Sequence, residues 1–260
     1  MALYREELAE MAGAFMIILF GAGAQCQAQL YPETGSYIQC LIGWAAGVSI
    51  GAAIAGPISG GHINPAVTVT MAVFRKFSWK KVPRYILAQT IGCMLATFTV
   101  CFVYRDAIKA FEHASKGNSI IGNFISIPNA SLSNLNVWFD EFVGTAILVG
   151  MIACLSDTNV HVGSNLSFHL FIIISAIAVA FGPQTGFAIN PARDFGPRIA
   201  LSLMGYEGVF FHDGAYWIWG IWLANIPGGL IGAFLADFFI YTGFDSPLYT
   251  ILGRSTALPV

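Results

Sequence analysis

The chain has 260 residues, of which 56% are hydrophobic and only 10% charged, and its mean hydropathy is +0.69. Soluble domains carry about 25% charged residues, so this composition excludes an ordinary soluble domain and favours a single membrane domain over residues 1–260. The net charge of -2 provides no basic field that would attract nucleic acid.

Uncharged stretches divide the chain into segments long enough to cross a bilayer, for which a helix needs about 20 apolar residues. We predict an all-α membrane protein with spans at 8–31, 36–57, 83–104, 138–156, 168–183 and 214–240. Two uncharged stretches, 34–74 and 158–192, are longer than one crossing requires. Each of them must therefore hold an additional segment at membrane depth.

The chain starts with a polar, acidic segment, and its first apolar segment is full length, so we expect that span to act as its own insertion signal. The five cysteines fall inside the predicted spans without the spacing of metal ligands, and we interpret them as small core side chains. No phosphate-binding loop, metal cluster or Ser-His-Asp arrangement is found in the sequence. We therefore predict no catalytic centre, no metal and no cofactor.

Basic residues gather in the segment before the third span: Arg75, Lys76, Lys80, Lys81 and Arg84. The positive-inside rule places this segment in the cytoplasm, together with both termini. The segment 105–137 then becomes an external loop with a glycosylation sequon at Asn129, whereas the sequon at Asn165 would face the cytoplasm and stay unmodified. We expect the plasma membrane as the location.

The sequence contains an internal repeat, with one copy in 1–104 and the other in 138–260. Glu10-Met-Ala-Gly13 recurs as Glu141-Phe-Val-Gly144, and Asn64-Pro65-Ala66 recurs as Asn190-Pro191-Ala192. Three crossings in each copy force the two copies into opposite orientations. Inverted repeats form a shared site near the bilayer midplane, at the interface between the halves.

Each Asn-Pro-Ala motif follows a Gly-rich segment within an overlong uncharged stretch. Because Asn is a strong N-cap and Pro suits the first turn of a helix, the motifs predict loops that dip into the membrane and start short helices. We expect these helices over 65–75 and 191–203, meeting end to end with Asn64 and Asn190 in contact. Carbonyl acceptors, Asn donors and two positive helix ends would suit neutral hydroxylated molecules and oppose cations and protons.

Two segments resemble the signature loops of the aquaporin family: Ser59-Gly-Gly-His-Ile-Asn-Pro-Ala-Val-Thr68 and Gly186-Phe-Ala-Ile-Asn-Pro-Ala-Arg-Asp-Phe-Gly-Pro-Arg198. The second is similar to the aquaglyceroporin branch. The resemblance implies a right-handed bundle of six transmembrane helices and two re-entrant half-helices. It also implies a homotetramer in membrane lipid, with one pore per subunit, that passes glycerol and water, excludes protons and ions, and is not an enzyme.

The resemblance also implies a role for individual residues. The selectivity filter would consist of Trp44, Phe187 and Arg193, with Ala178 leaving room where water-selective members carry a His. The carbonyl ladder would come from Gly60, Gly61, His62, Gly186, Phe187 and Ala188, around the pore-centre motifs Asn64, Pro65, Ala66, Asn190, Pro191 and Ala192. Structural support would come from Glu10, Glu141 and Asp194.

Several alternatives remain open from the sequence alone. Arg193 could form a salt bridge with Asp194, Trp44 could serve packing alone, and His62 could gate the pore. The buried glutamates could relay protons. Trp222, in the sixth span, is typical of the water-selective branch, which leaves the glycerol rate and size cutoff undetermined. A channel mainly for water, urea or ammonia, and a coupled transporter, are the competing functions.

Overall fold

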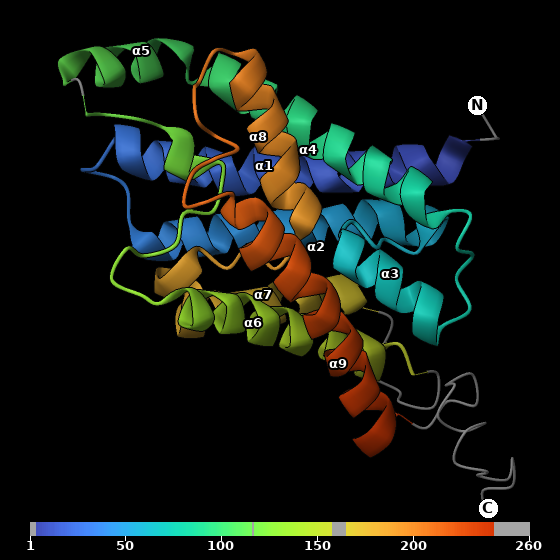
Figure 1. Ribbon diagram of the computed structural model, residues 1–260. Coiled ribbons are helices and arrows are strands. Elements are labelled where there is room, and N and C mark those ends of the chain that lie inside the picture. Colours follow the sequence, from blue (N-terminus) through green and yellow to red (C-terminus); the bar gives the residue numbers. More distant parts are fainter. Residues whose placement is uncertain (1–3, 116, 158–164, 242–260) are drawn as a thin grey trace, which may run out of the picture.

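The computed structural model describes residues 4–115, 117–157 and 165–241, and this part of the chain contains helices but no strand (Figure 1). Helices long and apolar enough to cross a membrane are α1 (Arg5–Leu30), α2 (Tyr37–Ser59), α4 (Val82–Val103), α6 (Asn134–Leu155), α7 (Leu166–Thr185) and Trp217–Phe239. The last of these begins as the π-helical segment η3 (Trp217–Trp222) and continues as α9 (Leu223–Phe239). The predicted all-α membrane fold with six spans is confirmed, with bounds close to those expected.

The two short helices predicted from the Asn-Pro-Ala motifs are also present, as α3 (Pro65–Phe74) and α8 (Pro191–Leu203). The preceding spans α2 and α7 end at glycines in the left-handed region, Gly60 with φ 89° and Gly186 with φ 82°. The chain then turns back through an irregular segment, and the side chain of Asn64 or Asn190 caps the new helix. Both loops are therefore built in the same way, from a glycine that ends one helix and an asparagine that caps the next.

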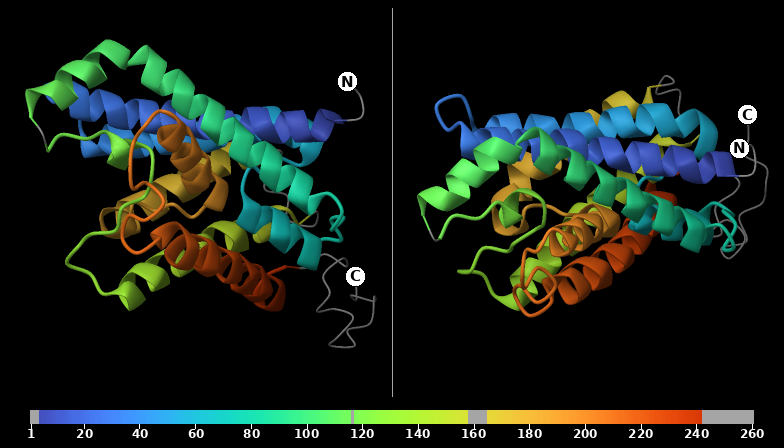
Figure 2. Two further views of the ribbon diagram at one scale, coloured as in Figure 1. Left: turned by 45° about the horizontal axis from the view of Figure 1, so that its top comes forward. Right: turned by 90° about the horizontal axis from the view of Figure 1, so that it is seen from above.

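The two halves of the chain form similar groups of helices that pack against each other. In the first half α1 packs against α2 and α4, and in the second half α6 packs against α9 and α7. Each half-helix then packs against a span of the other half, α3 against α9 and α8 against α4. In Figure 1 α3 and α8 leave the centre of the bundle in opposite directions, and Figure 2 shows the same arrangement from two other sides.

Close approach of α1 and α2 depends on glycine. A Cβ atom on Gly13 would lie 2.9 Å from the carbonyl oxygen of Gly51 and 3.1 Å from the Cβ of Ala55. These distances are shorter than van der Waals contact, so a side chain here would push the two helices apart. In the absence of a hydrophobic driving force between helices in lipid, such close backbone packing contributes to their association.

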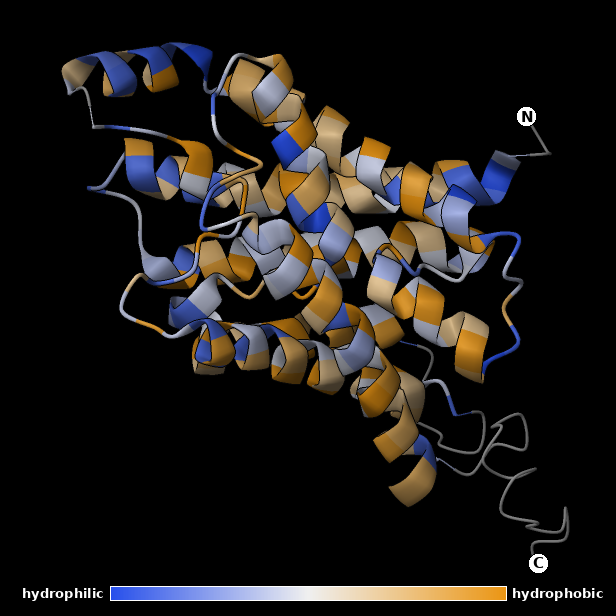
Figure 3. Ribbon diagram, in the orientation of Figure 1, coloured by the Kyte–Doolittle hydropathy of each residue, from blue (hydrophilic) through white to orange (hydrophobic). Residues whose placement is uncertain are grey.

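The spans are mostly apolar, as the hydropathy colours of Figure 3 show, and many of their large apolar side chains are exposed. Charged side chains lie at the ends of the helices instead. Lys81 pairs with Glu6 at 2.7 Å, and Arg75 pairs with Asp237 at 2.6 Å. These pairs bring the starts of α1 and α4 and the ends of α3 and α9 to one side of the bundle, where the basic segment 75–84 lies.

The segment 105–137, predicted as a loop, contains α5 (Arg105–Ala114) and the 3-10 turn η2 (Ile121–Asn123). Helix α5 is strongly amphipathic, with Ile108 buried and charged residues exposed on its other faces. Its apolar residues are few, so neither length nor hydropathy distinguishes it from a loop. Residues 242–260 of the expected second repeat lie outside the described residues.

Candidate functional site

The first re-entrant loop is held by Glu10, a fully buried carboxylate on α1. It accepts hydrogen bonds from the backbone N–H groups of His62 at 2.9 Å and Ile63 at 2.6 Å. The hydroxyl of Ser59 at 2.6 Å and the side-chain amide of Gln89 at 2.7 Å complete its shell. A buried carboxylate is tolerated only with such partners, and four donors satisfy it.

The second loop is held in the same way by Glu141 on α6, which is also fully buried. The N–H groups of Ala188 and Ile189 each donate to it over 2.8 Å. The Asn225 side-chain amide, oriented to suit its neighbours, donates to Glu141 over 3.2 Å and accepts from the backbone N–H of Asn190 over 3.1 Å. Asn225 on α9 thus corresponds to Gln89 on α4.

The two Asn-Pro-Ala motifs meet at the centre through an exchange of hydrogen bonds. The Asn64 amide donates to the carbonyl of Ile189 over 2.8 Å, and the Asn190 amide donates to the carbonyl of Ile63 over 2.9 Å. The hydrogen bonds of each asparagine side chain thus reach the loop that precedes the other asparagine. Each amide has two N–H groups, so one remains available beside the helix N-terminus.

The loop carbonyls are the next feature of the site. Within the described residues, no protein donor reaches the carbonyl oxygens of the six residues predicted as a ladder: Gly60, Gly61, His62, Gly186, Phe187 and Ala188. Ile63 and Ile189 have positive φ values of 43° and 38°, a conformation that costs a side chain about 1–2 kcal/mol. The carboxylates that bind the adjacent N–H groups offset this strain.

A narrow, partly open cavity runs along these loops. Its lining includes residues of the two loops, both motif asparagines and Arg193, together with apolar side chains. The apolar lining comes from both halves of the chain: Ile17, Trp44, Val48, Val67, Leu148, Ile152, Leu170 and Ile174. A molecule inside would therefore meet both hydrogen-bonding groups and hydrocarbon.

Trp44, Phe187 and Arg193 all line this cavity, so the structure brings the predicted filter residues together. The guanidinium carbon of Arg193 lies 3.9 Å from the centre of the Trp44 ring, a cation–π contact. Phe187 adopts a positive φ of 39° at the position where the first loop has Gly61. Its ring packs on the backbone of Gly182, where a Cβ would lie 3.2 Å away.

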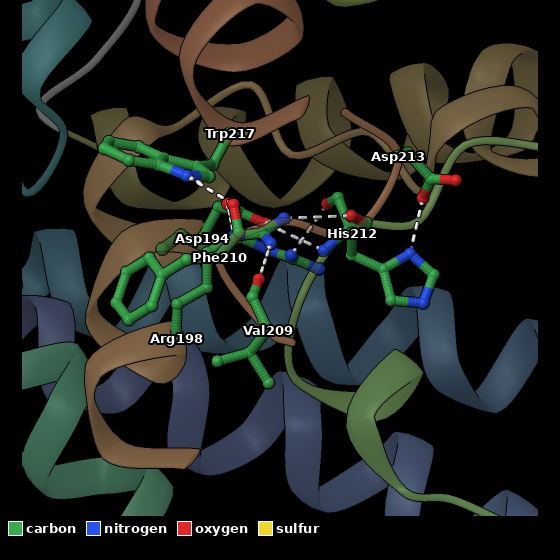
Figure 4. A network of polar contacts seen from close by, with 9 residues as sticks. Asp194, Arg198, Val209, Phe210, His212, Asp213 and Trp217 are labelled. Atoms are coloured by element: carbon green, nitrogen blue, oxygen red, sulfur yellow. Dashed lines mark hydrogen bonds and ion pairs between the residues drawn. The ribbon is translucent and has the colours of Figure 1, made fainter. Parts of the chain in front are cut away.

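The alternative pairing of Arg193 with Asp194 is wrong. Asp194 instead binds Arg198, over 2.6 Å to Nε and 3.2 Å to Nη2, and both side chains are buried (Figure 4). Arg198 also donates to the carbonyl of Val209, which ties the segment after α8 to the half-helix. The side chain of Arg193 instead donates to the Ser126 hydroxyl over 2.9 Å.

Comparison with known proteins identifies this arrangement. Residues 1–240 match the family model described as "Major intrinsic protein". The chain belongs to the major intrinsic protein family. The six spans and the two re-entrant loops described above are therefore those of a major intrinsic protein.

Individual relatives agree with this assignment. The chain is 41% identical to the aquaglycerol porin AQY3 of Saccharomyces cerevisiae over 250 residues, which are 94% of this chain but 39% of that protein. It is 39% identical to an aquaporin of Laccaria bicolor over 249 residues, covering 94% and 95% of the two chains. The aquaglyceroporin structure from Plasmodium falciparum superposes with a TM-score of 0.80 at 27% identity, covering 96% and 99%.

Two residues that left questions open in the sequence can now be located in this major intrinsic protein. Trp222 packs edge-on against Phe195, with ring centres 6.3 Å apart, and it does not line the cavity. His62 lines the cavity, and its ring packs against Phe77 at 4.7 Å and Tyr85 at 5.3 Å. Trp222 therefore makes no direct contact with the cavity.

Sequence reasoning missed three polar residues of the site. Gln89 and Asn225 occupy matching places in the internal repeat, and that correspondence is a signal that could have assigned them to the glutamates. Ser126 lies in the segment before α6, 67 residues from its partner Arg193, and carries no sequence signal of its role.

Proposed function

We propose that this chain is a passive channel for glycerol and water. The observation that carries the proposal is the amphipathic lining of the cavity, where the Arg193 guanidinium stacks on Trp44 and Phe187 contributes a second aromatic ring. Glycerol has a carbon backbone with hydroxyl groups, so it can pack against Trp44 and Phe187 while Arg193 donates to its oxygens. The names of the yeast and Plasmodium relatives support glycerol as a permeant.

The loops below the constriction provide a path for the same molecules. A hydroxyl or water can donate to the unpaired carbonyls and accept from the free N–H of Asn64 or Asn190. The apolar side chains that line the rest of the cavity give no competing hydrogen bonds. Neutral molecules that exchange hydrogen bonds one by one thus move without losing all their partners at once.

The same geometry supports exclusion of ions and protons. Arg193 carries a fixed positive charge in the constriction, and the N-termini of α3 and α8 each add the equivalent of about half a positive charge at the centre. A cation would meet both barriers and would also lose its hydration shell. The proposed function therefore includes selectivity against charged species, through Arg193 and the half-helix ends.

Assembly and orientation belong to the proposal as well. Apolar residues on the outer faces of the spans suit packing against lipid and against other copies, and the family resemblance favours a homotetramer with one pore per subunit. The basic segment 75–84 lies on the same side as the starts of α1 and α4, which supports a cytoplasmic location for that side in the plasma membrane.

Purified protein in liposomes tests the proposal. Stopped-flow light scattering would measure swelling in glycerol and shrinkage in an impermeant osmolyte, and an internal pH dye would report proton flux. We expect rapid glycerol and water movement without proton flux and without dependence on an imposed gradient. Water flux without glycerol flux would instead favour a water channel, and glycerol uptake driven by a proton gradient would favour a coupled transporter.

A further inference from the structure

One residue outside the spans binds three successive charged groups of the second half-helix. The backbone N–H of Ser126 donates to Asp194 over 2.8 Å, and its hydroxyl accepts from Arg193 over 2.9 Å. Its carbonyl accepts from Arg198 over 3.3 Å. Ser126 is 3% exposed, so each of its polar groups is occupied by α8 in a buried environment.

The segment that carries Ser126 is fixed in the bundle on both sides. Phe124 and Ile125 are in the hydrophobic core, with 0% and 2% exposure. Asn123 donates to the side chain of Gln29 on α1 over 2.6 Å, and the N–H of Asn129 donates to the carbonyl of Gln184 on α7 over 2.8 Å. Ser126 therefore lies at a defined place relative to both halves of the chain.

The hydroxyl of Ser126 is the acceptor available to hold Arg193. Both oxygens of Asp194 are engaged by Arg198 and by the N–H of Ser126, so the adjacent carboxylate does not fix the guanidinium. Among the residues that the structure describes, Ser126 provides the hydrogen bond to the Arg193 side chain, and Trp44 provides the stacking contact.

A hydroxyl acceptor leaves Arg193 charged and able to bind a permeant. A hydroxyl occupies one N–H of the guanidinium and leaves the others free, whereas a carboxylate would bind two and neutralise the charge. Arg193 thus keeps its positive charge and its free donors while its planar guanidinium is held against the Trp44 ring. The position of those donors decides whether they reach the hydroxyl oxygens of a permeant.

We propose that Ser126 is a positioning residue of the constriction, which sets the selectivity for glycerol over water by fixing Arg193 through its hydroxyl. The inference rests on the proposed glycerol and water channel. Water needs only one donor at a time and tolerates several positions of Arg193. Glycerol carries hydroxyls on adjacent carbons that need partners at the same time, so its passage depends on where the guanidinium is held.

Ser126→Ala tests the inference cleanly, because it removes the hydroxyl and keeps the backbone groups that bind Asp194 and Arg198. We expect the ratio of glycerol to water permeability to fall about three- to tenfold, as the loss of one net hydrogen bond would give. Ser126→Thr retains the hydroxyl and should restore the ratio. Ser119→Ala is the matched control, since the hydroxyl of Ser119 binds only the nearby Ile121 N–H and is exposed.

Each outcome in liposomes decides the question. An unchanged ratio in Ser126→Ala would overturn the inference, and so would a proportional loss of both fluxes with a lowered unfolding temperature, which would mark a structural role. If the Ala variant does not fold, the near-isosteric Ser126→Cys, whose sulfur is a weak acceptor, gives the same measurement. A parent protein that conducts neither solute would refute the proposed function itself, a result independent of the variants.

Discussion

Glu141→Gln should lower the free energy of unfolding by more than the small chemical difference between the two side chains suggests. The two oxygens of Glu141 accept from the N–H groups of Ala188 and Ile189, both over 2.8 Å. A glutamine has one oxygen, so its NH₂ group must face one of these N–H donors. One charge-assisted bond is lost, a loop N–H is left unpaired in the core, and the other bond loses its charge.

The expected size follows from these contacts. Hydrogen bonds to charged groups contribute about 1.5–3 kcal/mol each, so one lost bond and one weakened bond cost about 2–4 kcal/mol. At about 2–4 °C per kcal/mol for a chain of this size class, the unfolding temperature should fall by roughly 5–15 °C. Glycerol flux should fall too, because the displaced loop carries the second set of carbonyls and leads into α8, which carries Arg193.

Fluorescence-detected size-exclusion chromatography of heated samples measures the unfolding temperature, and stopped-flow measurements give the flux. Glu112→Gln is the matched control: Glu112 is half-exposed and accepts only from the Tyr206 hydroxyl, a bond that glutamine can also accept. If Glu141→Gln unfolds at the same temperature as the parent and conducts normally, the re-entrant loop does not depend on this carboxylate.

Three further predictions address the pore and its orientation. Trp44→Ala or Phe187→Ala should admit polyols larger than glycerol in liposome swelling assays; an unchanged size limit in both would remove these rings from the filter. Arg193→Ala combined with Phe187→Ala should let protons leak partially, since the central helix ends remain. A pH dye under an imposed potential would report the leak. A double mutant that conducts glycerol but leaks no more protons than the parent would contradict a charge barrier at Arg193. In a eukaryotic host, glycosidase treatment should shift the mobility of the parent and of Asn165→Gln but not of Asn129→Gln, and the opposite pattern would invert the proposed orientation.

The sequence predicted the spans and the half-helices well because their signals are local. Charge-free windows mark the spans, and Gly-rich segments followed by Asn-Pro mark the loops and the caps at Asn64 and Asn190. Helix α5 escaped prediction because its apolar face is small and its charges resemble those of a loop. The start of the fourth span was placed at 138 rather than Asn134 because polar residues precede its apolar part, although Ser133 is a good cap.

The side-chain partners in the site were harder to predict. The spacing of Asp194 and Arg198, four residues apart on a helix, is a local signal for their pairing, but it competes with the pairing of Asp194 with the adjacent Arg193. The contact between Ser126 and Arg193 joins an irregular segment to a half-helix through a fold that exists only when both halves have assembled. No periodicity or propensity encodes such a contact.

The arrangement of the glutamate contacts has a consequence for biogenesis. Glu10 binds only partners from its own half, namely Ser59, His62, Ile63 and Gln89, and Glu141 binds Ala188, Ile189 and Asn225 from the other. The bonds that cross between the halves include the two exchanged asparagine bonds, over 125 and 127 residues of chain, and the Arg75–Asp237 ion pair. During synthesis the first loop can thus be fixed by its own half, whereas the contacts at the centre form once the second half has been made.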